Sequence, residues 1–338
     1  MRRRLLTVAV ASLADGYVHR QSVLLPAGDQ AAALHGLLGF VTVVCGVAYA
    51  LVLLFLGWAL WRARRRFSHR AEPSAPDTSR DDRALQLGLA AWAAIITVGL
   101  VTVAGASFLV DRALANHDRP GPTDVRITAQ QWWWRLEYRD PGSGRWIEAA
   151  NELHLPLNRP SRVEIRSADV IHSFWVPNIS GKIDMVPGRT NHLTLTPRRL
   201  GWVRGQCAEF CGLQHARMAL DVKVETPEAY AAWLAAQRAP ASPPGDAAGA
   251  RGLVLVTSGA CGACHSIRGT SATARAAPDL THVASRRSLA AGTLPMTRGA
   301  LMGWIVQPQA LKPGSEMPAT GLSPADALAV VSYLEGLR

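Results

Sequence analysis

The chain has 338 residues, room for two or three domains, and its Lys and Arg outnumber its Asp and Glu by eleven. Strongly basic chains often bind nucleic acid or anionic lipid, but here the arginines cluster beside two long apolar stretches near the N-terminus. Composition and charge therefore indicate a membrane protein and argue against a nucleic-acid-binding protein.

The first residues have the pattern of a signal peptide, which we assign to residues 1–16. A basic segment, Arg2–Arg4, precedes the short apolar run Leu5–Ala14, which ends in small side chains. The alternative is an N-terminal tail that is not cleaved. In either case residues 17–33 would form an exported N-terminal segment.

Two apolar stretches predict transmembrane helices at residues 34–61 and 84–110. Neither contains Asp, Glu, Lys or Arg, and each exceeds the roughly 20 residues that a membrane span needs. Buried core helices are the alternative, but few of those stay uncharged over such a length. The loop 62–83 is expected in the cytoplasm because it is rich in arginine, so both ends of the hairpin would lie outside. Its arginines are Arg62, Arg64, Arg65, Arg66, Arg70, Arg80 and Arg83.

Residues 118–228 show the alternation of apolar and polar residues that is typical of β-strands. The clearest runs are Val163–Arg166, His192–Thr196 and Ala219–Val224. Several short strands punctuated by Gly and Pro predict a small β-sandwich or barrel. Residues 229–247, rich in Ala, Pro and Gly toward their end, are predicted to be a linker. Residues 248–338 have a helical, loop-rich pattern without strand alternation.

A cluster of metal-binding residue types lies between residues 207 and 218. Two thiolates, an imidazole and a thioether occur at Cys207, Cys211, His215 and Met218. His172 lies upstream, where a sandwich can bring a strand end beside this loop, and such soft ligands with imidazole suit copper. Two thiolates can bridge two copper ions, whereas a blue-copper site uses one. The Cys-x-x-x-Cys pair alone is more often a disulfide or incidental, but the joint set favours a metal centre.

These residues resemble the binuclear copper (CuA) domain of cytochrome c oxidase subunit II. The family pattern C-x-E-x-C-x-x-x-H-x-x-M is present at Cys207–Met218, and H-S-F-x-x-P is present at His172–Pro177. A third family element lies at Gly181–Arg189, and Gln131–Trp134 resembles the family's Q-W-x-W patch. The resemblance covers roughly residues 20–225, including the two apolar stretches.

The resemblance implies a two-helix transmembrane hairpin followed by a cupredoxin-like β-sandwich that holds the copper pair. The copper ligands that it implies are His172, Cys207, Glu209 through its carbonyl, Cys211, His215 and Met218. In this family the side chain matching Glu209 also reaches a magnesium ion at the boundary with the catalytic subunit. Trp132 would receive electrons, although an aromatic strand is more often part of a core than a conduit.

One position departs from the family pattern. The second span usually carries E-x-x-W-T near its cytoplasmic end, and here the matching residues are Leu89, Trp92 and Ala93. The family's glutamate is credited with feeding protons to the catalytic subunit, so this role is in doubt here. Asp81 and Asp82 lie nearby, but nothing in the spacing shows that they substitute.

Residues 261–265, Cys-Gly-Ala-Cys-His, form the pattern that attaches a c-type haem. Two thioether bonds, from Cys261 and Cys264, would fix the porphyrin, and His265 would ligate the iron. A methionine in a downstream loop is expected as the other axial ligand, because such ligation raises the potential. We assign this role to Met317.

The surroundings of Met317 support its assignment. The segment Lys312–Pro318 resembles the K-P-G-x-x-M-P loop of small class I cytochromes c. Pro278–Leu280 resembles the element whose proline carbonyl orients the haem histidine in that family. Met302 lies in a predicted helix interior and Met296 lies before that helix, so both are weaker candidates.

A closing helix is predicted after Ser323, which would cap it. Its apolar face is predicted to consist of Leu328, Val331, Leu334 and Leu337. This helix is expected at the end of a class I cytochrome c. The resemblance covers residues 248–338 and implies an all-α cytochrome c domain.

Together the two resemblances indicate a caa-type haem–copper oxidase, in which the donor cytochrome is fused to subunit II. The chain would pass electrons from haem c to the copper pair and on to a catalytic subunit that reduces oxygen to water and pumps protons. Residues 120–225 hold fourteen Lys plus Arg against eleven Asp plus Glu. A tethered donor has less need of an acidic docking face, because the tether supplies its effective concentration.

The expected partners are catalytic subunit I, a subunit III, and an external donor such as a cytochrome c or a bc-type complex. The expected location is the bacterial plasma membrane, with the copper and haem domains outside. The alternatives are the copper subunit of a nitric oxide reductase and, from another class, a copper chaperone with a thioredoxin-like fold. A quinol oxidase subunit is disfavoured, because those subunits lack the copper ligands found here.

Overall fold

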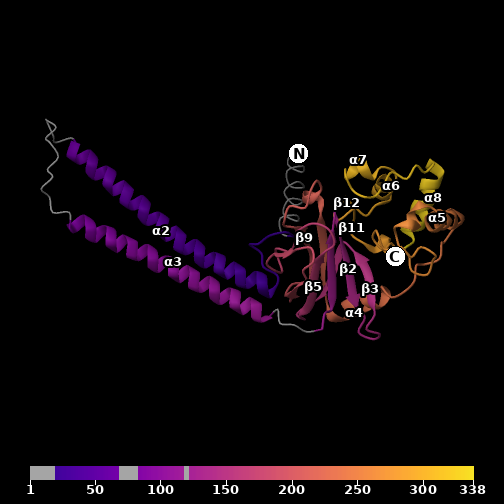
Figure 1. Cartoon of the computed structure of the whole chain (residues 1–338), viewed down its shortest axis with the longest axis horizontal. Helices are drawn as coiled ribbons and strands as arrows, with labels where there is room; N and C mark the ends of the chain where they lie inside the picture. The colour runs from indigo at the N-terminus through magenta and orange to yellow at the C-terminus, as the bar shows by residue number, and fades with distance from the viewer. Residues whose placement is uncertain (1–19, 68–82, 118–121) are drawn as a thin grey trace, which may run out of the picture. The chain divides into compact units, whose positions relative to one another are not determined.

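The computed structural model describes residues 20–67, 83–117 and 122–338 (Figure 1). The predicted signal peptide, most of the arginine-rich loop, and Asp81 and Asp82 lie outside the described residues. The chain divides into two compact units, which are considered separately. One is the helical hairpin of residues 33–116, and the other contains the N-terminal segment together with residues 117–338.

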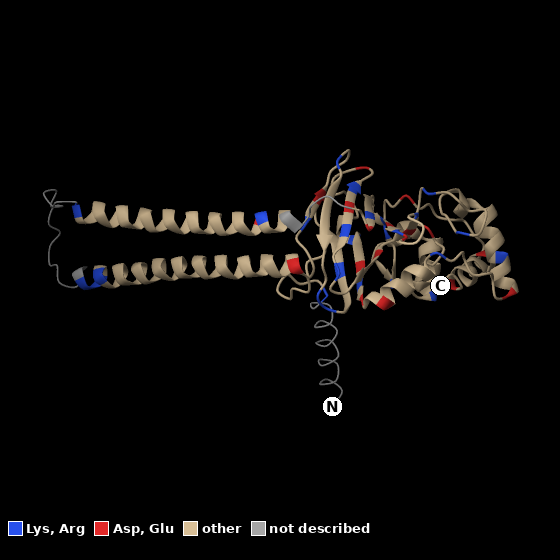
Figure 2. Ribbon diagram, turned by 90° about the horizontal axis from the view of Figure 1, so that it is seen from below, with Lys and Arg blue, Asp and Glu red and all other residues tan. Residues whose placement is uncertain are grey.

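Two long helices, α2 (Asp29–Phe67) and α3 (Arg83–His117), make up the hairpin. By length and composition both can cross a membrane. Figure 2 shows that their charged residues lie toward the helix ends. Both helices run beyond the predicted spans, because the flanking polar residues continue the helix without belonging to its apolar part.

The C-terminal end of α2 carries tryptophan and arginine side by side. The guanidinium of Arg65 lies 4.0 Å from the ring centre of Trp61, and that of Arg62 lies 5.3 Å from the ring centre of Trp58. Amphipathic aromatic rings beside cations are typical of the border between lipid and water. Leu89, which stands where the family has glutamate, is an exposed residue of α3.

Ten strands between residues 125 and 225 form a β-sandwich of two five-stranded sheets. The first sheet has the order β3-β2-β1-β5-β8, with β1 Val125–Gln130, β2 Trp133–Arg139, β3 Trp146–Ala150, β5 Ser161–Ser167 and β8 Asn191–Leu195. The second has the order β4-β10-β9-β6-β7, with β4 Glu152–Pro156, β6 His172–Trp175, β7 Ile183–Met185, β9 Gly201–Cys207 and β10 Ala219–Glu225. The predicted sandwich is confirmed, and the three alternating runs belong to β5, β8 and β10.

The core of the sandwich is made by the inward-facing residues of both sheets. Along β1 every second residue is buried, as the alternation requires. Trp134 from the first sheet meets Phe174 from the second edge to face, with ring centres 6.1 Å apart. This close packing holds the sheets together next to the strand ends that carry the metal-binding residues.

The N-terminal segment packs on the same sandwich. Arg204 N donates to the carbonyl of Arg20 at 2.8 Å, and Gln21 Nε2 donates to Gln206 Oε1 at 3.0 Å. At Gly28 a Cβ would lie 2.6 Å from the carbonyl oxygen of Ile179, so only glycine permits this approach. The beginning of α2 is therefore tied to the sandwich domain.

The predicted linker is wrong in its first half. A helix, α4 (Pro227–Ala236), occupies residues that were assigned to it, and its N-cap Thr226 accepts a hydrogen bond from Ala229 N. Leu234 is buried, and the Trp233 ring stacks on His154 of β4 with ring centres 3.8 Å apart. The helix forms because its apolar side chains cover one end of the sandwich, so the sandwich domain extends through α4.

The C-terminal domain is mostly helical and packs around α5 (Ala247–Ser258) and α8 (Pro324–Glu335). At Gly252 a Cβ would come within 2.1 Å of the carbonyl oxygen of Ala329, so this glycine lets α5 and α8 approach closely. The other elements are η2 (Ala260–Ala263), η3 (Val283–Ser285), α6 (Arg298–Val306) and α7 (Pro308–Leu311). A short hairpin, β11 (Ser288–Leu289) and β12 (Leu294–Pro295), is an addition to the predicted all-α fold.

The closing helix follows its prediction with one exception. Ser323 caps α8 by accepting a hydrogen bond from Asp326 N. Val331, Leu334 and Leu337 are buried, but Leu328 is 48% exposed, so its assignment to the apolar face is wrong. The helix instead turns Ala327 and Val330 inward in its place.

Candidate copper and haem centres

Strand pairing brings His172 next to the cysteine loop. β6 begins at His172 and pairs with β9 so that Phe174 lies opposite Cys207. The loop that follows Cys207 returns to the same place, because Cys207 N donates to the carbonyl of Met218 at 2.9 Å. Gly212 adopts a φ of 108° within this loop, a conformation that favours glycine. Two segments far apart in the sequence thus meet at one end of the sandwich.

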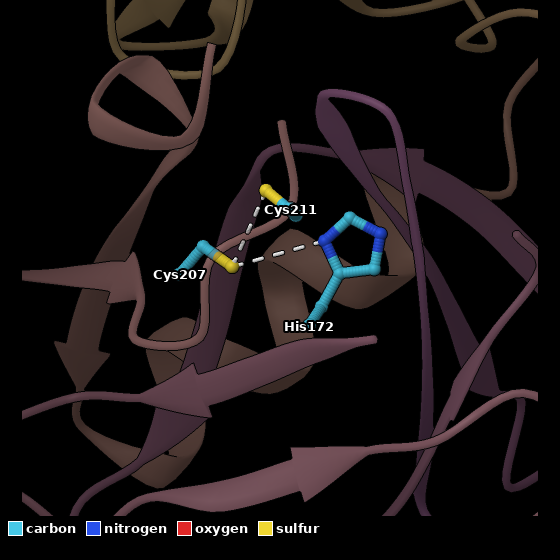
Figure 3. A group of neighbouring side chains, drawn as sticks. All are labelled: His172, Cys207 and Cys211. Atoms are coloured by element: carbon cyan, nitrogen blue, oxygen red, sulfur yellow. Dashed lines mark hydrogen bonds between the residues drawn. The ribbon is translucent and has the colours of Figure 1, made fainter. Parts of the chain in front are cut away.

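The sulfurs and imidazole nitrogens form a continuous chain of contacts, part of which is drawn in Figure 3. His172 Nδ1 lies 3.7 Å from Cys207 Sγ, and the two cysteine sulfurs are 3.8 Å apart. Cys211 Sγ in turn lies 3.7 Å from His215 Nδ1. His172, Cys207 and Cys211 are buried, so water has little access to this part of the site. Each cysteine therefore has a histidine of its own.

Two weaker donors complete the set. The carbonyl oxygen of Glu209 lies 3.2 Å from Cys207 Sγ, and Met218 Sδ lies 3.9 Å from Cys211 Sγ. All six residues that the sequence analysis named as copper ligands thus lie together. Two sulfurs that can bridge, with one nitrogen and one weak donor on each side, fit a pair of copper ions better than a single ion.

Asp169 orients His172, and the sequence analysis did not identify it. Its Oδ1 lies 2.8 Å from His172 Nε2. A hydrogen bond from Nε2 to the carboxylate leaves Nδ1 free to face the sulfurs, which is the usual arrangement behind a metal-binding histidine. The only sequence signal was an aspartate three positions before a candidate ligand.

The two thiols influence each other. A hydrogen bond from Cys211 lowers the pKa of Cys207, and the same contact together with burial raises the pKa of Cys211. The thiolate form that binds metal is therefore favoured at Cys207.

Trp132 is in direct contact with the metal-binding loop. Its indole Nε1 donates to the carbonyl of Cys211 at 2.9 Å, and Gln131 Nε2 donates to the same oxygen at 2.7 Å. Trp132 is only 9% exposed. The aromatic patch is thus both a part of the core and a neighbour of the copper ligands, so the two roles weighed for it do not exclude each other.

The haem-attachment motif lies at the end of α5. Cys261 is half-buried and Cys264 is exposed, and both thiols are free. His265 Nδ1 lies 2.7 Å from the carbonyl oxygen of Pro278, as the resemblance implied, so the ring nitrogen Nε2 is left for iron. Burial lowers the pKa of His265, which favours the neutral imidazole that a metal requires. These residues fit a covalently attached haem.

The three methionines of the C-terminal domain lie in different surroundings. Met302 on α6 and Met296 after β12 both pack against the apolar core of this domain. Met317 lies in the loop between α7 and α8, is half-buried, and does not belong to that core cluster within the described chain. Gln309 Nε2 holds the loop by donating to the carbonyl oxygens of Ser315 at 2.6 Å and Met317 at 2.8 Å. Met317 stays the predicted second axial ligand.

Comparison with known proteins gives matches along nearly the whole chain. The family described as cytochrome c oxidase subunit II, periplasmic domain, matches residues 139–225, and the cytochrome c family matches residues 249–338. Cytochrome c oxidase subunit 2 of Alkalihalophilus pseudofirmus is 31% identical over 245 residues, which cover 72% of this chain and 70% of the relative. The protein of the same name from Bacillus subtilis is 27% identical over 335 residues, 94% of this chain and 92% of the relative.

One of the solved structures that match is the periplasmic domain of subunit II of cytochrome oxidase from Bradyrhizobium japonicum. It is 30% identical, covers 36% of this chain and 96% of that chain, and superposes with a TM-score of 0.33.

Proposed function

The chain belongs to the cytochrome c oxidase subunit 2 family, and we propose that it receives electrons at its cytochrome c domain and delivers them from its copper domain to the catalytic subunit. It is an electron-transfer subunit of a terminal oxidase, and so part of an oxidoreductase. We assign the copper pair to His172, Cys207, Glu209, Cys211, His215 and Met218, and the haem to Cys261, Cys264, His265 and Met317.

The observation that carries the proposal is the double set of sulfur and nitrogen donors. Two sulfurs 3.8 Å apart, each with a histidine nitrogen at 3.7 Å, suit two metal ions that share their charge. When bound, the copper pair and the haem supply one-electron transfer. The β-sandwich around these donors is also not the thioredoxin-like fold of the copper-chaperone alternative.

The chain's own residues hold and orient these centres. Asp169 fixes the ring of His172, and the carbonyl of Pro278 fixes the ring of His265. Gln131 and Trp132 both hold the carbonyl of Cys211, which limits movement of the cysteine loop. A rigid site suits electron transfer, because little rearrangement is needed when the charge of the centre changes.

The partners and the orientation belong to the same proposal. The copper domain would deliver electrons to subunit I, with subunit III as a further neighbour, and an external cytochrome c or bc-type complex would reduce the cytochrome domain. The Glu209 side chain would contribute to a magnesium site at the boundary with subunit I. Arginines at the ends of α2 and α3 support a cytoplasmic loop, which would place both cofactor domains outside the cytoplasm.

Purification of the complex through a tag on this chain tests the proposal. The preparation should contain copper and haem c, and it should consume oxygen when a reductant is supplied. A complex that reduces nitric oxide and not oxygen would assign the chain to the nitric oxide reductase alternative. A chain that purifies alone, with one copper ion and no haem, would contradict the proposal.

A further inference from the structure

The loop that precedes Met317 rests on the copper domain. The backbone of this docking loop, residues 311–314, is held from the copper side. Arg217 Nη1 donates to the carbonyl of Leu311 at 2.7 Å, and Gln214 Nε2 donates to that of Pro313 at 2.6 Å. Both donors belong to the loop that carries the copper ligands.

The docking loop also covers Trp132. At Gly314, where φ is 80°, an added Cβ would lie 3.1 Å from Leu213 Cδ2 and 3.6 Å from the Trp132 ring. The backbone of the cytochrome domain therefore approaches the indole that holds the carbonyl of Cys211. A side chain larger than glycine at residue 314 would be strained by its φ and would press on Leu213.

Lys312 lies at the centre of this contact. It comes from the cytochrome domain, is only 2% exposed, and its Nζ donates to three backbone carbonyls. Two of them belong to the copper domain, Trp132 at 2.8 Å and Arg217 at 2.9 Å, and the third is Ala290 at 2.8 Å. An ammonium group has three donors, and burying it is costly unless each finds an acceptor. Here three carbonyl acceptors surround the nitrogen and match the donors of the charged form, while burial lowers the pKa of Lys312 to about 7.

A second set of contacts limits rotation about this point. Arg275 of the cytochrome domain pairs with Glu137 at 2.9 Å and with Glu148 at 2.6 Å, both on the first sheet of the sandwich. Arg287 N donates to Glu152 Oε2 at 2.7 Å. In these three contacts the cytochrome domain supplies the donors and the copper domain supplies the carboxylates. These acidic residues are engaged by the tethered donor itself.

We propose that Lys312 is a positioning residue that fixes the cytochrome c domain on the copper domain, with the Met317 loop seated over Trp132. The inference rests on the proposed function, because it concerns transfer between the two centres. Its physical basis is that a buried ammonium with three matched acceptors tolerates little displacement, whereas surface ion pairs such as those of Arg275 tolerate more. Among the contacts that set the distance between the haem loop and the cysteine loop, Lys312 is then the strongest, and the bonds from Gln214 and Arg217 assist it.

The test uses the assembled oxidase complex with both metals bound. Lys312→Met keeps an unbranched side chain that is one atom shorter, and it removes the donors. After the haem is reduced by a light pulse with an added photosensitiser, electron transfer to copper should slow by about tenfold or more, since small displacements of reacting groups have large effects on rate. The absorption bands of haem and copper and the haem potential should not change, which separates a positioning role from damage to either centre.

Two further variants complete the design. Arg298→Met removes a cation whose partner, Glu335, lies in the same domain, and it should transfer electrons at the unaltered rate. Gln214→Ala removes one docking bond from the copper side and should slow transfer by a smaller factor, about threefold. If the Lys312→Met complex fails to assemble, the Gln214→Ala variant tests the inference by itself.

Normal transfer in Lys312→Met with intact spectra would overturn the inference, as would normal transfer in Gln214→Ala where Lys312→Met does not assemble. Neither result would contradict the proposed function. An unaltered complex that lacks copper or haem would instead contradict the proposed function itself.

Discussion

Each cysteine of the copper loop has a different histidine as its neighbour, and this pairing decides how many metal ions the site can hold. A single copper ion needs one thiolate, so the second cysteine would be left buried without a role. Two ions that share both sulfurs use every donor, including Met218 and the carbonyl of Glu209. The buried position of Cys207 and Cys211 argues for the second arrangement.

Replacement of one bridging sulfur tests this arrangement. The unaltered chain should contain about two copper ions and give a mixed-valence signal in electron paramagnetic resonance. Cys207→Ser should abolish the shared-valence signal, because a serine oxygen is a harder donor than a thiolate sulfur and does not share charge between two copper ions. One copper ion per unaltered chain, with an ordinary blue-site spectrum, would show that the arrangement is wrong.

The assignment of Met317 as the second axial ligand can be tested by comparison with Met296 in the same domain. Met317→Ala should remove the sulfur-to-iron charge-transfer band of the oxidised protein, lower the haem potential and slow the uptake of electrons. Met296→Ala should leave the band intact, because that side chain packs in the core of the domain. The reverse pattern would transfer the ligand role to Met296.

At the scale of elements, α4 is fixed to the sandwich by a buried polar cluster. His154 of β4 lies between Glu225 at 2.8 Å and Glu152 at 3.0 Å, and its ring stacks on Trp233 of α4. Burial lowers the pKa of His154, but the hydrogen bonds with the two glutamates outweigh burial and raise it above the ordinary 6.5. The protonated ring is therefore the form that the folded domain prefers.

This cluster predicts a dependence of stability on pH. A raised histidine pKa contributes stability that is complete below pH 6.5 and is lost as the pH rises through the pKa of the folded protein. His154→Gln should lower the free energy of unfolding by about 1–3 kcal/mol at pH 6. The difference in melting temperature between the two proteins should shrink from pH 6 to pH 9. A difference that is constant or grows would contradict the predicted protonation of His154.

Some features of the fold and of the site could be predicted from the sequence, and others could not. The copper ligands could be named because they lie within one short loop and at the first residue of one strand. The strands could be predicted because apolar and polar residues alternate clearly along them. The helix α4 was missed because its alanines resemble those of a linker, although Thr226 and Pro227 form a helix start. Asp169 was not singled out, and Lys312 was named only as the first residue of a loop motif, since their partners are a ring nitrogen and backbone carbonyls that only the fold brings near.

At the scale of the whole molecule, the hairpin decides on which side of the membrane the cofactors lie. Protease added to intact spheroplasts should remove the C-terminal domain, because the arginines that flank α2 and α3 are expected in the cytoplasm and both hairpin ends outside. Cleavage that occurs only after the membrane is broken would reverse the assignment. An epitope placed in the loop between α2 and α3 serves as the control and should be protected until lysis.

The central claim is that electrons pass within this chain from haem c to the copper pair. In the purified complex, a light pulse that reduces the haem should be followed by reoxidation of the haem and reduction of copper with the same time course. In Cys207→Ser the haem should be reduced normally but should not reoxidise on that time scale. The account would be contradicted if copper were reduced before the haem in the unaltered complex, or if the haem of Cys207→Ser reoxidised at the unaltered rate.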